Sequence, residues 1–188
     1  MKKVWIFVEG TTDKALLEAV IQSCFPDADP KPDFWICGGW TKLKDVARKL
    51  DEVKASGGEP IIVFDADDQP TKRQEELMYQ LSELGHSCPI FLFPDNQSPG
   101  NVETLLRSIG SLPDFFRCWD EFQTCLKSLN ERYKTDPHQM VFAYEQVYLK
   151  KEEMKGPRFQ GTSTRLWEIH PESEGLQPFI TFLRPYFS

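Results

Sequence analysis

The chain has no excess of positive charge. Among its 188 residues, 22 Lys and Arg stand against 29 Asp and Glu, which gives a formal net charge of −7. A protein that coats nucleic acid without regard to sequence is normally basic, because it neutralises many phosphates. The composition therefore excludes such a coat protein. Any nucleic-acid role requires a local basic patch or a metal ion that bridges to the phosphates.

Long apolar runs and paired cysteines are missing as well. No apolar stretch approaches the ~20 residues that a membrane-spanning helix needs, and the segment before the first acidic residue does not resemble a signal peptide. The cysteines are odd in number and include no Cys-x-x-Cys pair; they are Cys24, Cys37, Cys88, Cys118 and Cys125. Such a set favours reduced thiols over disulfides. We therefore expect a cytoplasmic protein that makes no contact with a membrane.

Acidic residues do occur, at matching places after two apolar runs. Val4–Val8 is followed by Glu9, and Pro60–Phe64 is followed by Asp65 and Asp67. Each run is apolar on both faces, as in buried parallel strands, and each leads into a helical pattern. In open α/β sheets, ligands bind where the strands give way to helices. The pattern therefore places these carboxylates at a ligand-binding edge.

Strands and helices alternate through the first half of the chain. This pattern predicts a parallel sheet with right-handed crossovers and, in a flavodoxin-like arrangement, the strand order 2-1-3-4. The expected strands are Val4–Val8, Phe34–Cys37, Ile61–Phe64 and Cys88–Phe93, and the expected helices run from Thr11 to about Cys24, from Thr41 to about Lys54 and from Thr71 to Leu84. We therefore expect an α/β core over residues 1–110.

The second half is predicted to be a helical extension over residues 111–188. Apolar residues recur at steps of three and four from Pro113 to about Tyr133, which is typical of an amphipathic helix, and another helix is expected to begin at Pro137. Residues 155–164 are expected to form a polar loop. The apolar segment Leu176–Phe187 is expected to fold back onto the sheet, so that the whole chain forms one compact domain.

The predicted strand order brings Glu9 and Asp65 together, and a turn after Asp65 would bring Asp67 to the same side. Two carboxylates ~4 Å apart repel by about 4 kcal/mol at an effective dielectric constant of 20. The group therefore requires protons or a cation. Mg²⁺, or Mn²⁺ in its place, suits hard oxygen ligands, and the lack of His and Cys in both motifs argues against zinc.

Two further carboxylates are candidate metal ligands, and each has an alternative explanation. Glu103 follows the fourth strand, but an acidic residue in the first turn of a helix also stabilises the helix dipole by ~0.3–1 kcal/mol without any function. Asp13 follows the first strand and has the same alternative. Asp68 is better explained as a turn or capping residue, and Asp65 and Asp67 could simply cap the third helix.

The motif Glu-Gly-x-x-Asp that starts at Glu9, together with the motif Asp-x-Asp that starts at Asp65, resembles the Toprim domain of topoisomerases, bacterial primases, recombination proteins and OLD-type nucleases. The resemblance covers about residues 1–110. It implies a Rossmann-like Toprim fold in which Asp65 and Asp67 bind Mg²⁺ and Glu9 acts as general acid or base, or as a metal ligand. Asp13 matches an acidic position of the OLD-like branch.

The segment from Phe93 to Leu106 further resembles a group of small, stand-alone, uncharacterised bacterial Toprim-like proteins. The resemblance implies metal-assisted phosphoryl transfer on a nucleic acid, in the manner of a nuclease. Glu103 or Asp13 could complete a second metal site. None of the five tyrosines is marked as a nucleophile and no zinc-binding part is present, so topoisomerase or primase activity is not expected of this chain alone.

Contacts to the nucleic acid are expected from a basic patch late in the chain. Its members, with aromatic residues between them, are Lys150, Lys151, Lys155, Arg158 and Arg165. Such a patch could contact phosphates, although neighbouring glutamates favour a solvated helix end. His86, His138 and His170 are scattered and show no metal-ligand spacing.

Two other classes of function remain open. A Toprim-like domain could keep its cation site and serve as a non-catalytic regulatory or partner-binding module. Receiver domains and haloacid-dehalogenase-like phosphatases also place carboxylates at strand ends. Receiver domains also need a hydroxyl after the fourth strand and a lysine after the fifth, whereas the phosphatases carry Asp-x-Asp after the first strand. Both classes fit this sequence less well than a Toprim-like domain does. The sequence does not specify whether the nucleic acid is DNA or RNA, and it does not specify an oligomeric state.

Overall fold

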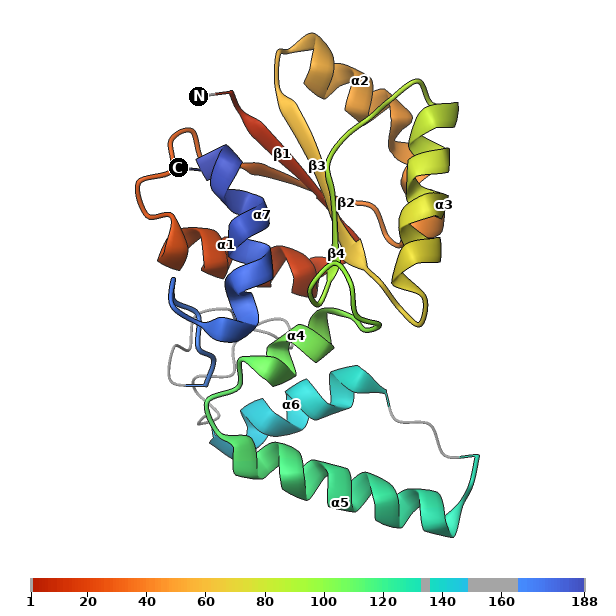
Figure 1. Ribbon diagram of the computed structural model, residues 1–188, viewed down its shortest axis with the longest axis vertical. Coiled ribbons are helices and arrows are strands. Elements are labelled where there is room, and N and C mark those ends of the chain that lie inside the picture. Colours follow the sequence, from red (N-terminus) through yellow and green to blue (C-terminus); the bar gives the residue numbers. More distant parts are fainter. Residues whose placement is uncertain (1, 133–135, 149–165, 188) are drawn as a thin grey trace.

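The computed structural model describes residues 2–132, 136–148 and 166–187 (Figure 1). Strands and helices alternate in the first half, and helices alone follow. The elements in chain order are β1 (Val4–Val8), α1 (Thr11–Cys24), β2 (Asp33–Ile36), the 3₁₀ helix η1 (Trp40–Val46), α2 (Ala47–Ala55), β3 (Glu59–Asp65), α3 (Pro70–Glu83), β4 (Ile90–Phe93), α4 (Val102–Ser108), α5 (Pro113–Leu129), α6 (Pro137–Tyr148), the 3₁₀ helix η2 (Glu174–Leu176) and α7 (Gln177–Phe187).

Four parallel strands form the sheet in the order β2-β1-β3-β4, which confirms the predicted topology. Val8 at the end of β1 is opposite Ile36 of β2 and Val63 of β3. Asp65 at the end of β3 is opposite Phe93 of β4. All four strands therefore end at one edge of the sheet, and the residues that follow them emerge there.

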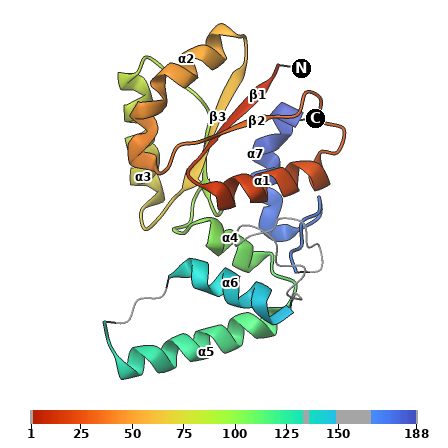
Figure 2. The ribbon, with the colours of Figure 1, turned by 180° about the vertical axis from the view of Figure 1, so that it is seen from behind.

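Helices cover both faces of the sheet (Figures 1 and 2). α1 and α7 lie on one face, and α2 and α3 lie on the other. Successive strand residues point into opposite layers: in β3, Ile61 and Val63 belong to the core under α1 and α7, whereas Ile62 and Phe64 belong to the core under α2 and α3. Because both faces of the central strands are buried, β1 and the middle of β3 are apolar, whereas the edge strand β2 begins with Asp33 and is partly exposed.

The second predicted helix is only partly α-helical. The sequence predicted one helix from Thr41 to about Lys54, whereas the chain forms η1 first and α2 afterwards. Gly39, with φ of 119°, precedes η1, and the N–H of Trp40 donates a hydrogen bond to the Glu9 carboxylate. This anchor fixes the start of the segment, and a 3₁₀ turn is a common way to enter an α-helix.

The C-terminal helix α7 completes the layer beside α1. The ring of Phe179 lies 4.8 Å from that of Phe91 and 5.3 Å from that of Phe93, centroid to centroid, and both partners belong to β4. All three side chains are buried. The predicted return of the C-terminal segment to the sheet is therefore confirmed.

Replacement of Phe179 by Ala is expected to lower the free energy of unfolding by about 3–5 kcal/mol, because it leaves a cavity under α7. Phe122→Ala on α5 is the matched control, since that side chain is 51% exposed and its loss should change stability by only about 0.5 kcal/mol. Urea denaturation followed by tryptophan fluorescence measures both. A small loss for Phe179→Ala would contradict a stabilising role of α7 in the core.

Helices α4, α5 and α6 lie beyond the carboxyl end of the sheet (Figure 1). α6 contacts α4, and the ring of Tyr144 on α6 stacks on that of Phe116 on α5 with centroids 5.0 Å apart. The Tyr144 hydroxyl accepts from the N–H of Leu112 at 3.1 Å and donates to the carbonyl of Leu166 at 2.9 Å. These contacts fix α6 against α4 and so bring its first turn to the edge where the strands end.

The predicted helix from Pro113 ends at Leu129 rather than near Tyr133. Tyr133 itself and the predicted polar loop over 155–164 lie outside the described residues. Within the described ranges, no helix combines the length and the apolar character that a membrane crossing requires.

Candidate functional site

Four carboxylates meet at the edge where the strands end. We call Glu9, Asp13, Asp65 and Glu103 the acidic cluster; they come from the ends of β1 and β3 and from the first turns of α1 and α4. The pKa of Asp65 reflects their proximity. Burial and the charges of Asp13, Glu9 and Glu103 together raise this pKa to about 9. The sequence predicted all four residues as candidates, and the fold brings them within electrostatic reach of one another.

Glu9 ties the sheet to η1. Its Oε1 accepts from the N–H of Asp65 at 3.1 Å, and its Oε2 accepts from the N–H of Trp40 at 3.2 Å. Burial raises the pKa of Glu9, with smaller contributions from the charges of Asp13 and Asp67, although the hydrogen bond from Asp65 lowers it. This carboxylate thus has a structural role that the sequence did not indicate, and each oxygen keeps a further lone pair.

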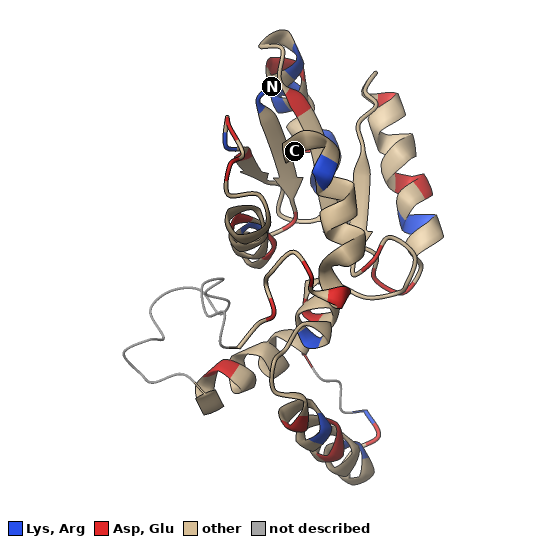
Figure 3. Cartoon of the chain, turned by 60° about the vertical axis from the view of Figure 1, so that its left-hand side comes forward, with Lys and Arg blue, Asp and Glu red and all other residues tan. Residues whose placement is uncertain are grey.

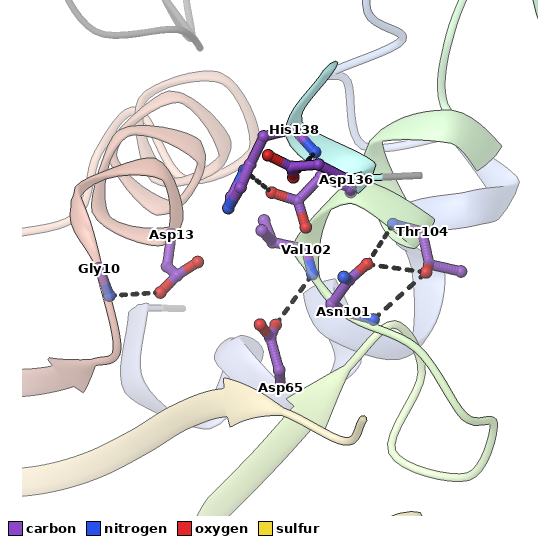
Figure 4. A network of polar contacts seen from close by, with 9 residues as sticks. Gly10, Asp13, Asp65, Asn101, Val102, Thr104, Asp136 and His138 are labelled. Carbon is purple, nitrogen blue, oxygen red and sulfur yellow. Dashed lines mark hydrogen bonds and ion pairs between the residues drawn. The ribbon is translucent and has the colours of Figure 1, made fainter. Parts of the chain in front are cut away.

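Asp13 belongs to the acidic cluster and reaches it from the first turn of α1. Its Oδ2 accepts from the N–H of Gly10 at 2.7 Å, which satisfies one of the donors at the start of the helix. The side chain is buried, and burial raises its pKa. Figure 4 shows Asp13, Asp65 and His138 directed toward a common space from three different elements. The expected capping role is therefore present, and it does not turn the carboxylate away from its acidic neighbours.

Asp65 reaches from β3 to the start of α4. Its Oδ1 accepts from the N–H of Val102 at 2.9 Å, and Asn101 caps the same helix through the N–H of Thr104 at 3.0 Å (Figure 4). Glu103, in the first turn of α4, is buried, and burial raises its pKa. The first turn of α4 thus donates a hydrogen bond to the Asp65 carboxylate and adds the carboxylate of Glu103 to the acidic cluster.

His138 is a site residue that the sequence did not reveal. Its Nδ1 lies 2.5 Å from Oε1 of Glu103, and its charge also acts on Asp13. The backbone N–H of His138 donates to Oδ1 of Asp136 at 2.9 Å, and Asp136 thereby caps the start of α6. The three histidines are far apart in sequence, and His138 reaches the site only because α6 contacts α4. The only feature near His138 that the sequence predicted was the start of a helix at Pro137.

Asp67 does not point into the acidic cluster. It has φ of 51° and its backbone pairs with that of Gly100. Its Oδ2 lies 2.5 Å from Nη2 of Arg73, whose guanidinium stacks on the Trp40 ring at 3.9 Å from the centroid. The structure therefore brings Glu9 and Asp65 together as predicted, while Asp67 forms an ion pair beside them. Its charge still raises the pKa of Glu9.

The acidic cluster offers carboxylate oxygens, which are suitable ligands for a hard cation. Carboxylate oxygens are the ligands that Mg²⁺ and Mn²⁺ prefer, and a divalent charge would offset both the burial and the like charges that raise the pKa of Asp65. Across residues 2–132, 136–148 and 166–187, however, no three Asp, Glu, His or Cys side chains are arranged so that they could hold a metal ion as they stand. A cation would therefore have to draw these side chains closer together.

Two cavities flank Asp67 and Asp68. One, of about 450 Å³, extends from these aspartates along α4 to Glu103 and Arg107. The other, of about 370 Å³, extends from them to Trp40 and the first turn of α3. Both are therefore beside the acidic cluster and are large enough to accept part of a substrate.

The predicted basic patch is not part of the described residues. All of its residues lie outside the described part of the chain: Lys150, Lys151, Lys155, Arg158 and Arg165. In the described part, Lys and Arg alternate with Asp and Glu along α5 (Figure 3). The basic residues that line the flanking cavities are Lys72, Arg73 and Arg107.

Comparisons with known proteins identify a family but no activity. No curated protein matches the chain significantly, and no solved structure does. A family described as "Protein of unknown function (DUF3226)" matches residues 3–188, which is nearly the whole chain. The chain belongs to the DUF3226 family.

Proposed function

We propose that this protein is a Mg²⁺- or Mn²⁺-dependent enzyme of nucleic-acid phosphoryl transfer, nuclease-like in its chemistry. The observation that supports this most strongly is the acidic cluster itself, in which burial and the charges of three neighbouring carboxylates raise the pKa of Asp65 to about 9. Like charges are rarely gathered in a partly buried place without a cation or a proton to balance them. The order of the motifs, which resembles that of Toprim domains, supports the same function.

Each residue of the acidic cluster has a role in this proposal. Asp65, Asp13 and Glu103 would hold the cation, and Glu9, whose pKa is raised by burial, serves as general acid or base. A bound divalent ion would neutralise phosphate oxygens of the substrate. His138 orients Glu103 from α6. Asp67 becomes a ligand only if it leaves Arg73.

A cleavage assay tests the proposed function. The full chain would be incubated with single- and double-stranded DNA and RNA, with Mg²⁺, with Mn²⁺ or with a chelator. Metal-dependent cleavage is expected, with a loss of at least about 100-fold in Asp65→Ala and a smaller loss, about tenfold, in Asp67→Ala. Asp27→Ala is the matched control, because this aspartate is exposed in the loop after α1.

Cleavage that persists in chelator, or that is unchanged in Asp65→Ala, would contradict the proposal. The second candidate function is a non-catalytic Toprim-like module for regulation or partner binding. It is favoured by one observation, that both oxygens of Glu9 already accept backbone hydrogen bonds. Cation binding by the acidic cluster without cleavage of any of the four substrates would support that module instead.

A further inference from the structure

The first turn of α3 carries charges of the wrong sign for a helix start. α3 runs over Pro70–Glu83, and its first turn contains Lys72 and Arg73 but no acidic residue. The N-terminus of a helix is itself positive, so cations there are unfavourable and anions are favourable. Within the described residues, no side chain caps the exposed N–H groups of this turn. An anion bound there would balance both the helix dipole and the basic side chains.

Arg73 supplies an independent sign of a missing ligand. The residue is only 9% exposed, and one of its nitrogens, Nη2, is paired with Asp67. Nε lies 3.8 Å from the Glu76 carboxylate, beyond hydrogen-bond distance. In the described part of the chain, neither Nε nor Nη1 has a hydrogen-bond partner. Buried donors without partners are costly, and the stack on Trp40 holds the guanidinium in this position.

Both features meet in the smaller of the two cavities beside Asp67. Trp40, Gln69, Lys72 and Arg73 line it, so the start of α3 and the Arg73 side chain border the same space of about 370 Å³. The site is close to the acidic cluster, since the charge of Arg73 acts on Glu9. Three carboxylates also line the cavity, those of Asp67, Asp68 and Glu76. They compete with any anion for the two cations.

We propose that this cavity is a phosphate subsite, in which Arg73, Lys72 and the N–H groups at the start of α3 bind a phosphate of the substrate next to the acidic cluster. The subsite rests on the proposed function and deepens it, because it names the group that the site recognises. In the described arrangement, Asp67 pairs with Nη2, and a phosphate that contacts two nitrogens of the guanidinium, Nη2 and either Nη1 or Nε, would need this nitrogen too. Phosphate and Asp67 therefore exclude each other from Arg73, and a planar guanidinium suits bidentate contact with a phosphate.

A phosphate titration of the full chain tests the subsite without any cleavage. Inorganic phosphate would be titrated into metal-free protein in a chelating buffer, and binding would be followed by ³¹P NMR. Asp67→Asn is expected to bind phosphate about threefold to tenfold more tightly than the wild type, because it frees Arg73. Arg73→Ala should bind at least about tenfold more weakly, and Arg73→Lys should lie between, since Lys keeps the charge but not the planar fork.

Arg48→Ala on α2 is the matched control, because its side chain is 92% exposed, and its phosphate affinity should equal that of the wild type. If Arg73→Ala fails to fold, Lys72→Ala and Asp67→Asn decide the question. An unchanged affinity in Asp67→Asn, an equal loss in Arg48→Ala, or no binding by any variant would overturn the subsite. Phosphate binding without nuclease activity would uphold the subsite and refute the proposed function.

Discussion

Asp65→Asn is expected to melt roughly 4–8 °C higher than the wild type in metal-free buffer at pH 8, which corresponds to a gain of about 2 kcal/mol. The pKa of Asp65 is about 9 in the folded protein, against an ordinary value of 3.8. At pH 8 the folded chain must therefore keep a proton that the unfolded chain has lost, or else bury a charge among like charges. Asn removes this cost and still offers an oxygen to the N–H of Val102.

The same linkage sets the pH dependence of the metal-free wild type. Because the folded pKa of Asp65 is raised, its stabilising contribution is complete below about pH 4 and is lost as the pH rises toward about 9. Burial raises the pKa of Glu9, Asp13 and Glu103 in the same direction. Thermal melts between pH 5 and pH 9 should show stability falling with pH, and the slope should be smaller in Asp65→Asn.

The control for this prediction is Asp27→Asn, which removes one exposed negative charge and should leave both the melting temperature and its slope unchanged. A divalent cation should stabilise the wild type at pH 8 and should stabilise Asp65→Asn much less, since the variant lacks a charged ligand. If Asp65→Asn melted below the wild type at pH 8, the charges of the acidic cluster would not destabilise the metal-free fold.

Glu9→Gln is expected to affect both stability and activity. The carboxylate uses one oxygen for the N–H of Asp65 and the other for the N–H of Trp40. Gln offers only one acceptor oxygen, and its amide group would face a second donor, so the free energy of unfolding should fall by about 1–3 kcal/mol. If Glu9 is the general acid or base, nuclease activity should also fall by about 10²–10⁴-fold.

Denaturant melts and initial cleavage rates measure the two effects of Glu9→Gln separately, at a temperature where the variant is fully folded. Glu18→Gln on the exposed face of α1 is the control and should change neither. Full activity in a destabilised Glu9→Gln protein would assign Glu9 to structure alone. Unchanged stability would contradict the hydrogen bonds on which its placement depends.

Most of the fold was predictable because its signals are local. The buried strands β1, β3 and β4 are short apolar runs, and segments with helical spacing of apolar residues follow them in the chain. Gly85, for example, follows the predicted helix end at Leu84 and has φ of 70°, a backbone angle that glycine adopts readily. Alternation of strands and helices then predicts a parallel sheet, and the order 2-1-3-4 is that of the flavodoxin-like arrangement, one of the common arrangements of such sheets.

The site was predictable only as far as the strand ends determine it. Glu9 and Asp65 meet because β1 and β3 are neighbours in register. The direction of Asp67 depends on a single backbone angle and on a partner six residues later, Arg73, and neither has a sequence pattern that predicts it. His138 joins the site through the packing of α6 on α4, which is a tertiary contact that no local periodicity encodes.

The most direct test is a crystal structure of the full chain grown with Mn²⁺, in which anomalous scattering locates the ion. We predict an anomalous peak at the carboxyl end of β1 and β3, with Asp65 and at least one of Asp13 and Glu103 as ligands. Absence of a peak there at a saturating Mn²⁺ concentration, or a peak at some other place alone, would contradict the claim that the acidic cluster is a metal site.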